Sequence, residues 1–174
     1  MLPRVGISHC LLGERVRYDG GHKRSEVVTG VLGSRFQWVA VCPEVDVGMG
    51  VPREPVRLID AANGPRMVGV RSRGDWTDEM RSYSRSRADR LAVEDLSGFV
   101  FKQDSPSCGM SQVEVWDDRD TATRAGVGLF AAALMKRLPN LPVEDEGRLQ
   151  DHRVAEDFVD RVYAYQRWIN ENSC

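Results

Sequence analysis

The sequence lacks a hydrophobic run long enough to cross a membrane. A transmembrane helix needs about 20 consecutive apolar residues, whereas the longest candidate here spans only residues 125–135. The first ten residues also lack the basic lead-in and the apolar core of a signal peptide. We therefore expect a cytoplasmic protein with no part embedded in a membrane.

The sequence also lacks an excess of basic residues. Lys and Arg together number 24, of which only three are Lys, and Asp and Glu number 26, so the formal charge at pH 7 is −2. Proteins that bind nucleic acids or membrane surfaces usually carry concentrated positive charge. The balance argues against a nucleic-acid partner and leaves an acidic or neutral small molecule as the expected ligand.

Apolar residues make up 41% of the 174 residues, which is enough for one hydrophobic core. Short apolar runs of strand length alternate with stretches in which apolar residues recur at helical spacing. Strands are expected at residues 4–9, 36–41, 56–60, 67–71, 98–101 and 113–116, and helices at 25–34, 77–96, 127–138 and 151–169. The turn Asn63-Gly64-Pro65 predicts a hairpin beside the sheet. The alternation predicts an α/β fold, a three-layer Rossmann-like domain with a mainly parallel sheet flanked by helices.

Four cysteines occur, at positions 10, 42, 108 and 174, and a reducing compartment would keep them as free thiols. The first three lie at or just past the carboxyl ends of expected strands, which is the edge where open α/β sheets bind ligands. Their separations of 32 and 66 residues exclude a zinc ribbon or a ferredoxin run, whose ligands lie about two to four residues apart. Folding could still bring them together, and three ligands would leave one coordination position open, as in catalytic metal sites. Cys174 is expected to be uninvolved.

Spacing alone leaves a plainer alternative, in which these cysteines are buried as small hydrophobic residues. The neighbouring residues favour a site. The turn Ser105-Pro106-Ser107-Cys108-Gly109 has hydroxyl and N–H groups that can face negatively charged sulfur, and Cys42-Pro43-Glu44 puts a carboxylate close to a potential ligand. His9 adjoins Cys10, but side chains alternate along a strand, so we do not expect His9 to be a ligand.

Five motifs occur in order along residues 3–147. They are Ser8-His9-Cys10-Leu11-Leu12-Gly13, Arg17-Tyr18-Asp19-Gly20, Cys42-Pro43-Glu44, Gly48 with Pro52-Arg53-Glu54-Pro55, and Lys102 with Ser105-Pro106-Ser107-Cys108-Gly109. Together they resemble the thiouracil desulfidase family. The resemblance implies a [4Fe-4S] cluster held by Cys10, Cys42 and Cys108, with the fourth iron free to bind the sulfur of a thiocarbonyl group. It also implies a hydrolysis without electron transfer, which turns a thiolated nucleobase such as 2-thiouracil into uracil and releases hydrogen sulfide.

The same resemblance suggests roles for individual residues. Glu44 is the expected acid–base group, and Ser105 is the second catalytic residue, which places or relays a proton to the ring. Tyr18 could stack on a pyrimidine and Asp19 could accept a ring N–H, with Ser107 as a further substrate-binding residue. Each has a plainer alternative as a residue that only stabilises local turns. Arg53 and Lys102 could offset the charge of the cluster or belong to structural ion pairs.

The resemblance also divides the chain into two parts. Residues 1–150 correspond to the desulfidase-like iron-sulfur domain, and residues 151–174 form a helix that resembles the junction to a second domain in longer relatives. The expected apolar stripe of this helix is Val154, Phe158, Val162, Tyr165 and Trp168 or Ile169. Either the domain itself or a second subunit has to cover that stripe, so a homodimer is one option.

Three other functions stay open at this stage. A sulfur-transfer enzyme could use the same open iron to move sulfide onto an acceptor such as a tRNA base, although it should need a basic docking surface. A non-catalytic iron-sulfur module could stabilise the fold or report redox state. A zinc hydrolase is the third alternative, and iron analysis would separate it from the others.

Overall fold

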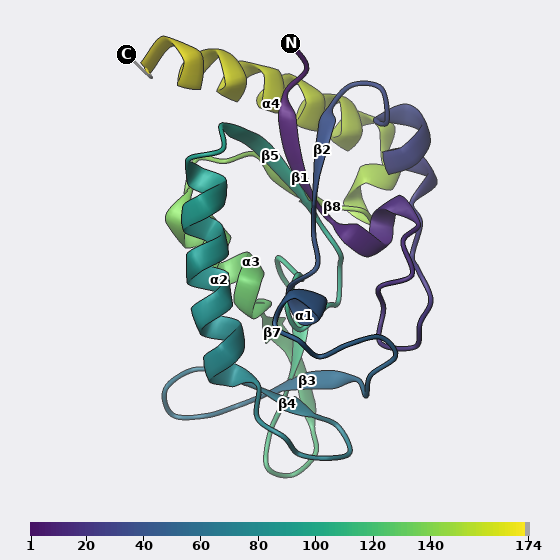
Figure 1. The fold of residues 1–174 in the computed structure, drawn as a ribbon, viewed down its shortest axis with the longest axis vertical. Helices are drawn as coiled ribbons and strands as arrows, with labels where there is room; N and C mark the ends of the chain where they lie inside the picture. The colour runs from purple at the N-terminus through teal and green to yellow at the C-terminus, as the bar shows by residue number, and fades with distance from the viewer. Residues whose placement is uncertain (173–174) are drawn as a thin grey trace.

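The computed structural model describes residues 1–172, which form two four-stranded sheets with helices around them (Figure 1). Sheet A has the strand order β2-β1-β5-β8, and all its neighbouring strands are parallel. Its strands are β1 (Arg4–Ser8), β2 (Gln37–Val41), β5 (Leu96–Phe101) and β8 (Val143–Asp145). Sheet B has the order β4-β3-β6-β7, in which β3 and β6 are parallel and each also belongs to an antiparallel hairpin. Its strands are β3 (Val56–Ile59), β4 (Arg66–Gly69), β6 (Val113–Trp116) and β7 (Ala122–Gly126).

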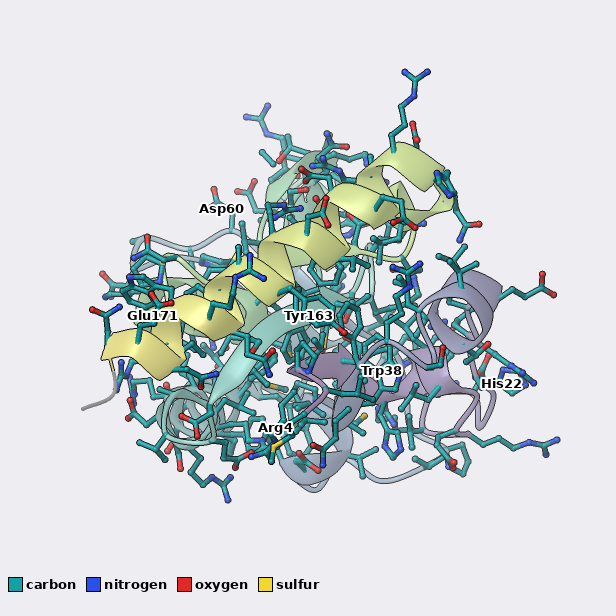
Figure 2. All side chains as sticks on the ribbon, turned by 90° about the horizontal axis from the view of Figure 1, so that it is seen from above. Arg4, His22, Trp38, Asp60, Tyr163 and Glu171 are labelled. Atoms are coloured by element: carbon teal, nitrogen blue, oxygen red, sulfur yellow. The ribbon has the colours of Figure 1, made fainter. Side chains whose placement is uncertain are left out.

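Helices cover both faces of sheet A, which confirms the predicted three-layer α/β fold with a mainly parallel sheet. On one face, α2 (Thr77–Ala92) and α3 (Leu129–Arg137) enclose a core that includes Phe99 and Phe130. On the other face, α4 (His152–Asn172) and the short π-helical segment η2 (Val27–Val31) enclose a core that includes Phe158. Figure 2 shows α4 crossing the molecule, with Tyr163 midway along it. Because both faces are covered, β5 is buried along its whole length.

A glycine in β1 lets the central strands pack closely. A Cβ atom at Gly6 would lie 2.2 Å from the Cδ2 atom of Phe99, a distance that real Cβ contacts do not show. The Phe99 ring therefore lies directly over β1, and any side chain at position 6 would displace it. This contact holds β1 beside β5, and two of the candidate cysteines lie on the loops that follow these strands.

The largest difference from the predicted fold is the second sheet. The predicted hairpin forms as β3 and β4, and the predicted strand at residues 113–116 forms as β6, but the two pair with each other in sheet B and not with sheet A. The strand β7 was not predicted, because its sequence Ala-Thr-Arg-Ala-Gly has little apolar character and mostly faces solvent. The strand β8 was also missed, because it has only three residues and three residues show no periodicity.

The helices differ from the predictions mainly in their extent. The helix expected at residues 25–34 forms only the segment η2, where Gly30 lowers helical stability. At its start the Oγ of Ser25 accepts the N–H of Val28 at 3.4 Å, and Val31 at its end is exposed. The helix α2 ends at Ala92, because β5 already begins at Leu96. The remaining short helices are η1 (His9–Leu12), α1 (Pro43–Asp46) and η3 (Arg148–Gln150).

The predicted stripe of α4 is buried only in part. Phe158 and Val162 are fully buried against sheet A, as expected, whereas Trp168 is 51% exposed and stacks on Tyr165. None of the helices within residues 1–172 is long and apolar enough to cross a bilayer. Cys174 lies outside the described residues.

Candidate active site

A cavity of about 500 Å³ lies at the carboxyl edge of sheet A, facing sheet B. Residues at or after the ends of β1, β2 and β5 line one side, among them Ser8, Val41 and Lys102, and residues of β3 and β6 line the other. Its volume falls within the range of small-molecule sites, roughly 300–1,000 Å³. It also occupies the edge at which open α/β sheets bind ligands.

The strand order brings three cysteines to this cavity. Because β2, β1 and β5 are neighbours, the loops that follow them start side by side. Cys10 lies in η1 directly after β1, Cys42 follows β2 and precedes α1, and Cys108 lies in the loop between β5 and β6. All three line the cavity and all are free thiols. In Figure 1, α1 lies at the lower ends of β1 and β2, on the side of sheet B.

Burial dominates the electrostatics of these thiols. It raises the pKa of Cys10 to about 11 and that of Cys108 to about 12, and it also raises the pKa of Cys42. Nearby groups oppose this effect. The charges of Lys102 and Arg17 lower the pKa of Cys10, and the hydroxyl groups of Ser8 and Ser107 lower the pKa of Cys108. Buried thiols of this kind stay protonated near pH 7 unless a bound cation stabilises the thiolate. The donor set therefore fits a strongly cationic, sulfur-seeking group such as an iron-sulfur core.

The spacing of the donors also bears on which group they could hold. Within residues 1–172, no three His, Cys, Asp or Glu side chains lie close enough together to hold a single metal ion. The zinc-hydrolase alternative requires such a group. A [4Fe-4S] core instead binds each cysteine through a different iron, so it needs thiols that face one cavity but lie farther apart than the ligands of a single ion.

The loop that carries Cys108 is held by the start of α3. The Oγ of Ser105 accepts the N–H groups of Ser107 and Cys108 at 3.3 and 3.0 Å, which closes the turn. The carbonyl of Ser107 accepts N–H groups from Phe130 and Ala131 in the first turn of α3. A Cβ atom at Gly128 would lie 2.5 Å from that carbonyl, so glycine permits the close approach. Cys108 is thus fixed by a rigid element rather than by a free loop.

Hydrogen bonds connect this loop to the turn after Cys42. The hydroxyl of Ser107 donates to Oε1 of Glu44 at 3.0 Å, and its oxygen lies 3.1 Å from Oγ of Ser105. The other carboxylate oxygen of Glu44, Oε2, accepts Nε and Nη2 of Arg53 at 3.0 and 2.7 Å. Since Ser105 already accepts two N–H groups, its own proton is available for Ser107. The structure therefore brings Ser105, Ser107 and Glu44 into one chain of hydrogen bonds.

Of the three residues expected to bind the substrate, Ser107 and Tyr18 line the cavity and Asp19 does not. Tyr18 lines the cavity, 39% exposed, with the Arg17 guanidinium 5.4 Å from its ring centroid. Asp19 is exposed and does not line the cavity; its Oδ1 accepts the N–H of Gly21 at 2.9 Å. The geometry of Asp19 is that of a residue that stabilises a turn, and it does not support a role in substrate binding.

Arg53 and Lys102 both form ion pairs at the cavity. Arg53 pairs with Glu44, and Lys102 pairs with Glu146 and donates to the carbonyl of Gln103 at 2.9 Å. The backbone N–H of Lys102 also donates to Oγ of Ser8 at 2.9 Å. Lys102 is therefore a member of an ion pair, and its charge also lowers the pKa of Cys10.

Several residues that line the cavity were not assigned to the site from the sequence. Ser8 is 2% exposed and hydrogen-bonds the Cys108 sulfur; the only signal in the sequence was its place in the first motif. His9 was expected to face away from Cys10, but the chain there is a 3₁₀ turn and not a strand, so His9 also lines the cavity. Trp116 also lines the cavity, beneath the guanidinium of Arg57, which lies 4.9 Å from the centroid of its ring. That wall belongs to sheet B, which the sequence did not reveal.

Comparisons with known proteins agree with this fold and cavity. The model of a family described as 2-thiouracil desulfurase matches residues 5–146, a range that includes all three cavity cysteines. YbbK of Bacillus subtilis (strain 168), described as uncharacterized, is 33% identical over 111 residues, which are 59% of this chain and 71% of that protein. A solved structure of the [4Fe-4S]-dependent thiouracil desulfidase TudS is similar with a TM-score of 0.69 and 28% identity, covering 89% of this chain and 98% of the other.

Proposed function

The chain belongs to the 2-thiouracil desulfurase family, and from that premise we propose that it is a [4Fe-4S]-dependent desulfidase. Its substrate would be a small thiolated nucleobase such as 2-thiouracil, which it converts into uracil with release of hydrogen sulfide. The observation that carries the proposal is the meeting of Cys10, Cys42 and Cys108 at one cavity, beside the hydrogen-bonded chain of Ser105, Ser107 and Glu44.

The three cysteines would hold the cluster through one sulfur each. When bound, the cluster supplies an iron without a protein ligand, which acts as a Lewis acid on the carbon–sulfur double bond of the substrate. The positive charges of Lys102 and Arg17 lie near Cys10 and help to balance the thiolate charge. The hydroxyl of Ser8 does the same at Cys108 by hydrogen bonding.

Glu44 would act as the base for the attacking water. Its Oε2 is occupied by Arg53, so Oε1 is the atom that can accept a proton. The carboxylate is only 14% exposed, which limits competition from bulk water. Once Oε1 is protonated, it can donate to Ser107, and the directions of the hydrogen bonds in the chain reverse.

Ser105 would then deliver a proton to the ring. After the reversal, the Ser107 hydroxyl donates to Ser105 in place of the longer N–H bond from Ser107 (3.3 Å), and the Ser105 hydroxyl is free to point at a ring nitrogen in the cavity. One proton thus moves from water to the ring nitrogen through Glu44, Ser107 and Ser105. This proton and the second proton of the water leave with the sulfur as hydrogen sulfide, so the ring keeps its original number of N–H groups. Tyr18 would stack on the pyrimidine and hold it in the cavity. Water supplies the oxygen that replaces sulfur, so the reaction needs no external electrons.

Other expectations extend this proposal beyond the site. We infer a cytoplasmic enzyme without a nucleic-acid partner, with residues 1–150 as the iron-sulfur domain and α4 as a helix that resembles the junction to a second domain in longer relatives. The exposed ring of Trp168 supports a surface that another domain or a second copy of the chain covers.

Anaerobic reconstitution with iron and sulfide tests the function. The reconstituted protein should show the visible absorption of a [4Fe-4S] cluster and release sulfide from 2-thiouracil as uracil appears. An intact cluster without sulfide release from a panel of thiocarbonyl compounds would reject the proposal. Sulfide transferred to an acceptor base would then identify the sulfur-transfer alternative, and no reaction at all would favour the non-catalytic module.

A further inference from the structure

Arg53 contacts two separate segments of the cavity lining at once, the turn of α1 that carries Glu44 and the loop of residues 16–18. It lies in the loop between α1 and β3, and its side chain is 7% exposed. We propose that Arg53 is a positioning residue that couples the segment of residues 16–18, which carries Tyr18, to the carboxylate of Glu44. The proposal rests on the desulfidase function proposed above, because it assigns Glu44 and Tyr18 to one reaction.

The first half of this coupling is the contact with Glu44. Nε and Nη2 of Arg53 both donate to Oε2, at 3.0 and 2.7 Å. With Oε2 held in this way, the carboxylate cannot rotate to exchange its oxygens, and Oε1 stays directed at Ser107. Arg53 thereby determines which oxygen of Glu44 faces the proton relay.

The second half is the contact with residues 16–18. Nη1 of Arg53 donates to the carbonyl of Val16 at 3.0 Å, and the backbone N–H of Arg53 donates to the carbonyl of Tyr18 at 2.8 Å. Val16 and Arg17 direct their own N–H groups within the loop, to Glu14 and Gly21. Residue 53 therefore ties this loop to the rest of the cavity through both its side chain and its backbone.

The chemistry of arginine explains why this residue type suits the position. A planar guanidinium offers donors in several fixed directions, so one side chain can hold a carboxylate and carbonyl groups at the same time. Here Nη1 also donates to the carbonyl of Gly50 at 2.8 Å, which fixes the plane of the group. Lysine would keep the positive charge near Glu44 but could not reach all of these acceptors together.

Hydrogen–deuterium exchange tests the coupling directly. We expect Arg53→Lys and Arg53→Gln to raise the exchange rate of peptides from residues 14–21 about tenfold, since each loses side-chain hydrogen bonds. Glu44→Gln should also raise this exchange rate severalfold, because the neutral amide binds the Arg53 guanidinium more weakly than the carboxylate does. Glu44 itself has no hydrogen bond to residues 14–21 among the contacts of the structure. The control is Arg161→Lys, which alters a pair with Glu144 outside the cavity and should leave this exchange unchanged.

Steady-state kinetics with 2-thiouracil supplies the second readout. In Arg53→Lys we expect kcat to fall by about 10–100-fold and KM to rise severalfold. Its iron content should equal that of the Arg161→Lys control. Unchanged exchange at residues 14–21 in both Arg53 variants would overturn the coupling, and so would unchanged exchange in Glu44→Gln. If the wild-type protein releases no sulfide, the proposed function fails. The exchange data still decide whether Arg53 couples residues 16–18 to Glu44.

Discussion

Ser107 donates a hydrogen bond to Glu44 across 63 positions of sequence, with 3.0 Å between Oγ and Oε1. One of these residues directly precedes Cys108, and the other lies two positions after Cys42. Their bond therefore connects two loops that each carry a candidate cluster ligand. It also places the expected base next to the expected proton relay, so ligand binding and proton transfer depend on the same local structure.

Replacing Glu44 by Gln should separate turnover from cluster binding. The amide cannot accept the proton from water, so we expect kcat to fall by at least about 100-fold, while iron content and visible absorption stay near those of the wild type. Glu54→Gln is the matched control, because Glu54 lies in the same region of the chain but binds Ser72 and the backbone at Arg71 rather than the cavity. Full activity in Glu44→Gln would contradict its role as the base.

Substitutions of the two serines of the relay should have different effects. Ser107→Ala interrupts the relay and leaves Oε1 of Glu44 without its donor, so kcat should fall by about 10–100-fold with the cluster retained. Ser105→Ala also removes the acceptor for the N–H of Cys108, so it should lower both kcat and the stability of the cluster in air. Measuring both kcat and the rate of iron loss in air distinguishes the two variants. Identical iron loss in the two variants would argue against this division of roles.

Single substitutions of cysteine should identify the cluster ligands. Cys10→Ser, Cys42→Ser and Cys108→Ser should each reduce bound iron from about four per chain to below one after anaerobic reconstitution. Cys174→Ser is the control and should retain the full amount, because Cys174 is not expected to bind the cluster. Quantifying iron and acid-labile sulfide gives the result. Loss of iron in the control variant, or its retention in one of the other three, would revise the ligand set.

Acid stability should depend on Asp75 at the start of α2. Hydrogen bonds from Arg66 and then from Thr77 lower the pKa of Asp75 from 3.8 to about 2. Because the pKa is lower in the folded state, the stabilisation is fully present above pH 3.8 and is lost as the pH falls toward 2. Urea unfolding at pH 2, 3, 4 and 5 should show this decline in the wild type. The decline should be smaller in Asp75→Asn, and equal slopes in the two proteins would contradict the assignment.

The alternation of strands and helices could be predicted from the sequence because burial on two faces selects apolar residues. The runs at β1 and β5 are short and apolar, as central parallel strands require, and β2 at the edge of the sheet has a similar run although it is less buried. Sheet B could not be recognised, since the Val-Glu-Val-Trp sequence of β6 fits any half-buried strand and does not specify its partner. The π-helical form of η2 and the three-residue strand β8 depend on tertiary contacts that no local pattern encodes.

By itself, the sequence determined the residue types that the chemistry requires: three cysteines beyond strand ends, Glu44 close to one of them, and two serines before another. The tertiary structure was needed to show that Ser107 meets Glu44 and that Arg53 joins Glu44 to residues 16–18. It was also needed to show that His9 and Trp116 line the cavity and that Asp19 does not. The physical reason is that strand order and loop geometry determine which side chains from distant segments come within hydrogen-bond distance. Local residue patterns carry the composition of a site, whereas the packing of β2, β1 and β5 against the loops and sheet B determines its geometry.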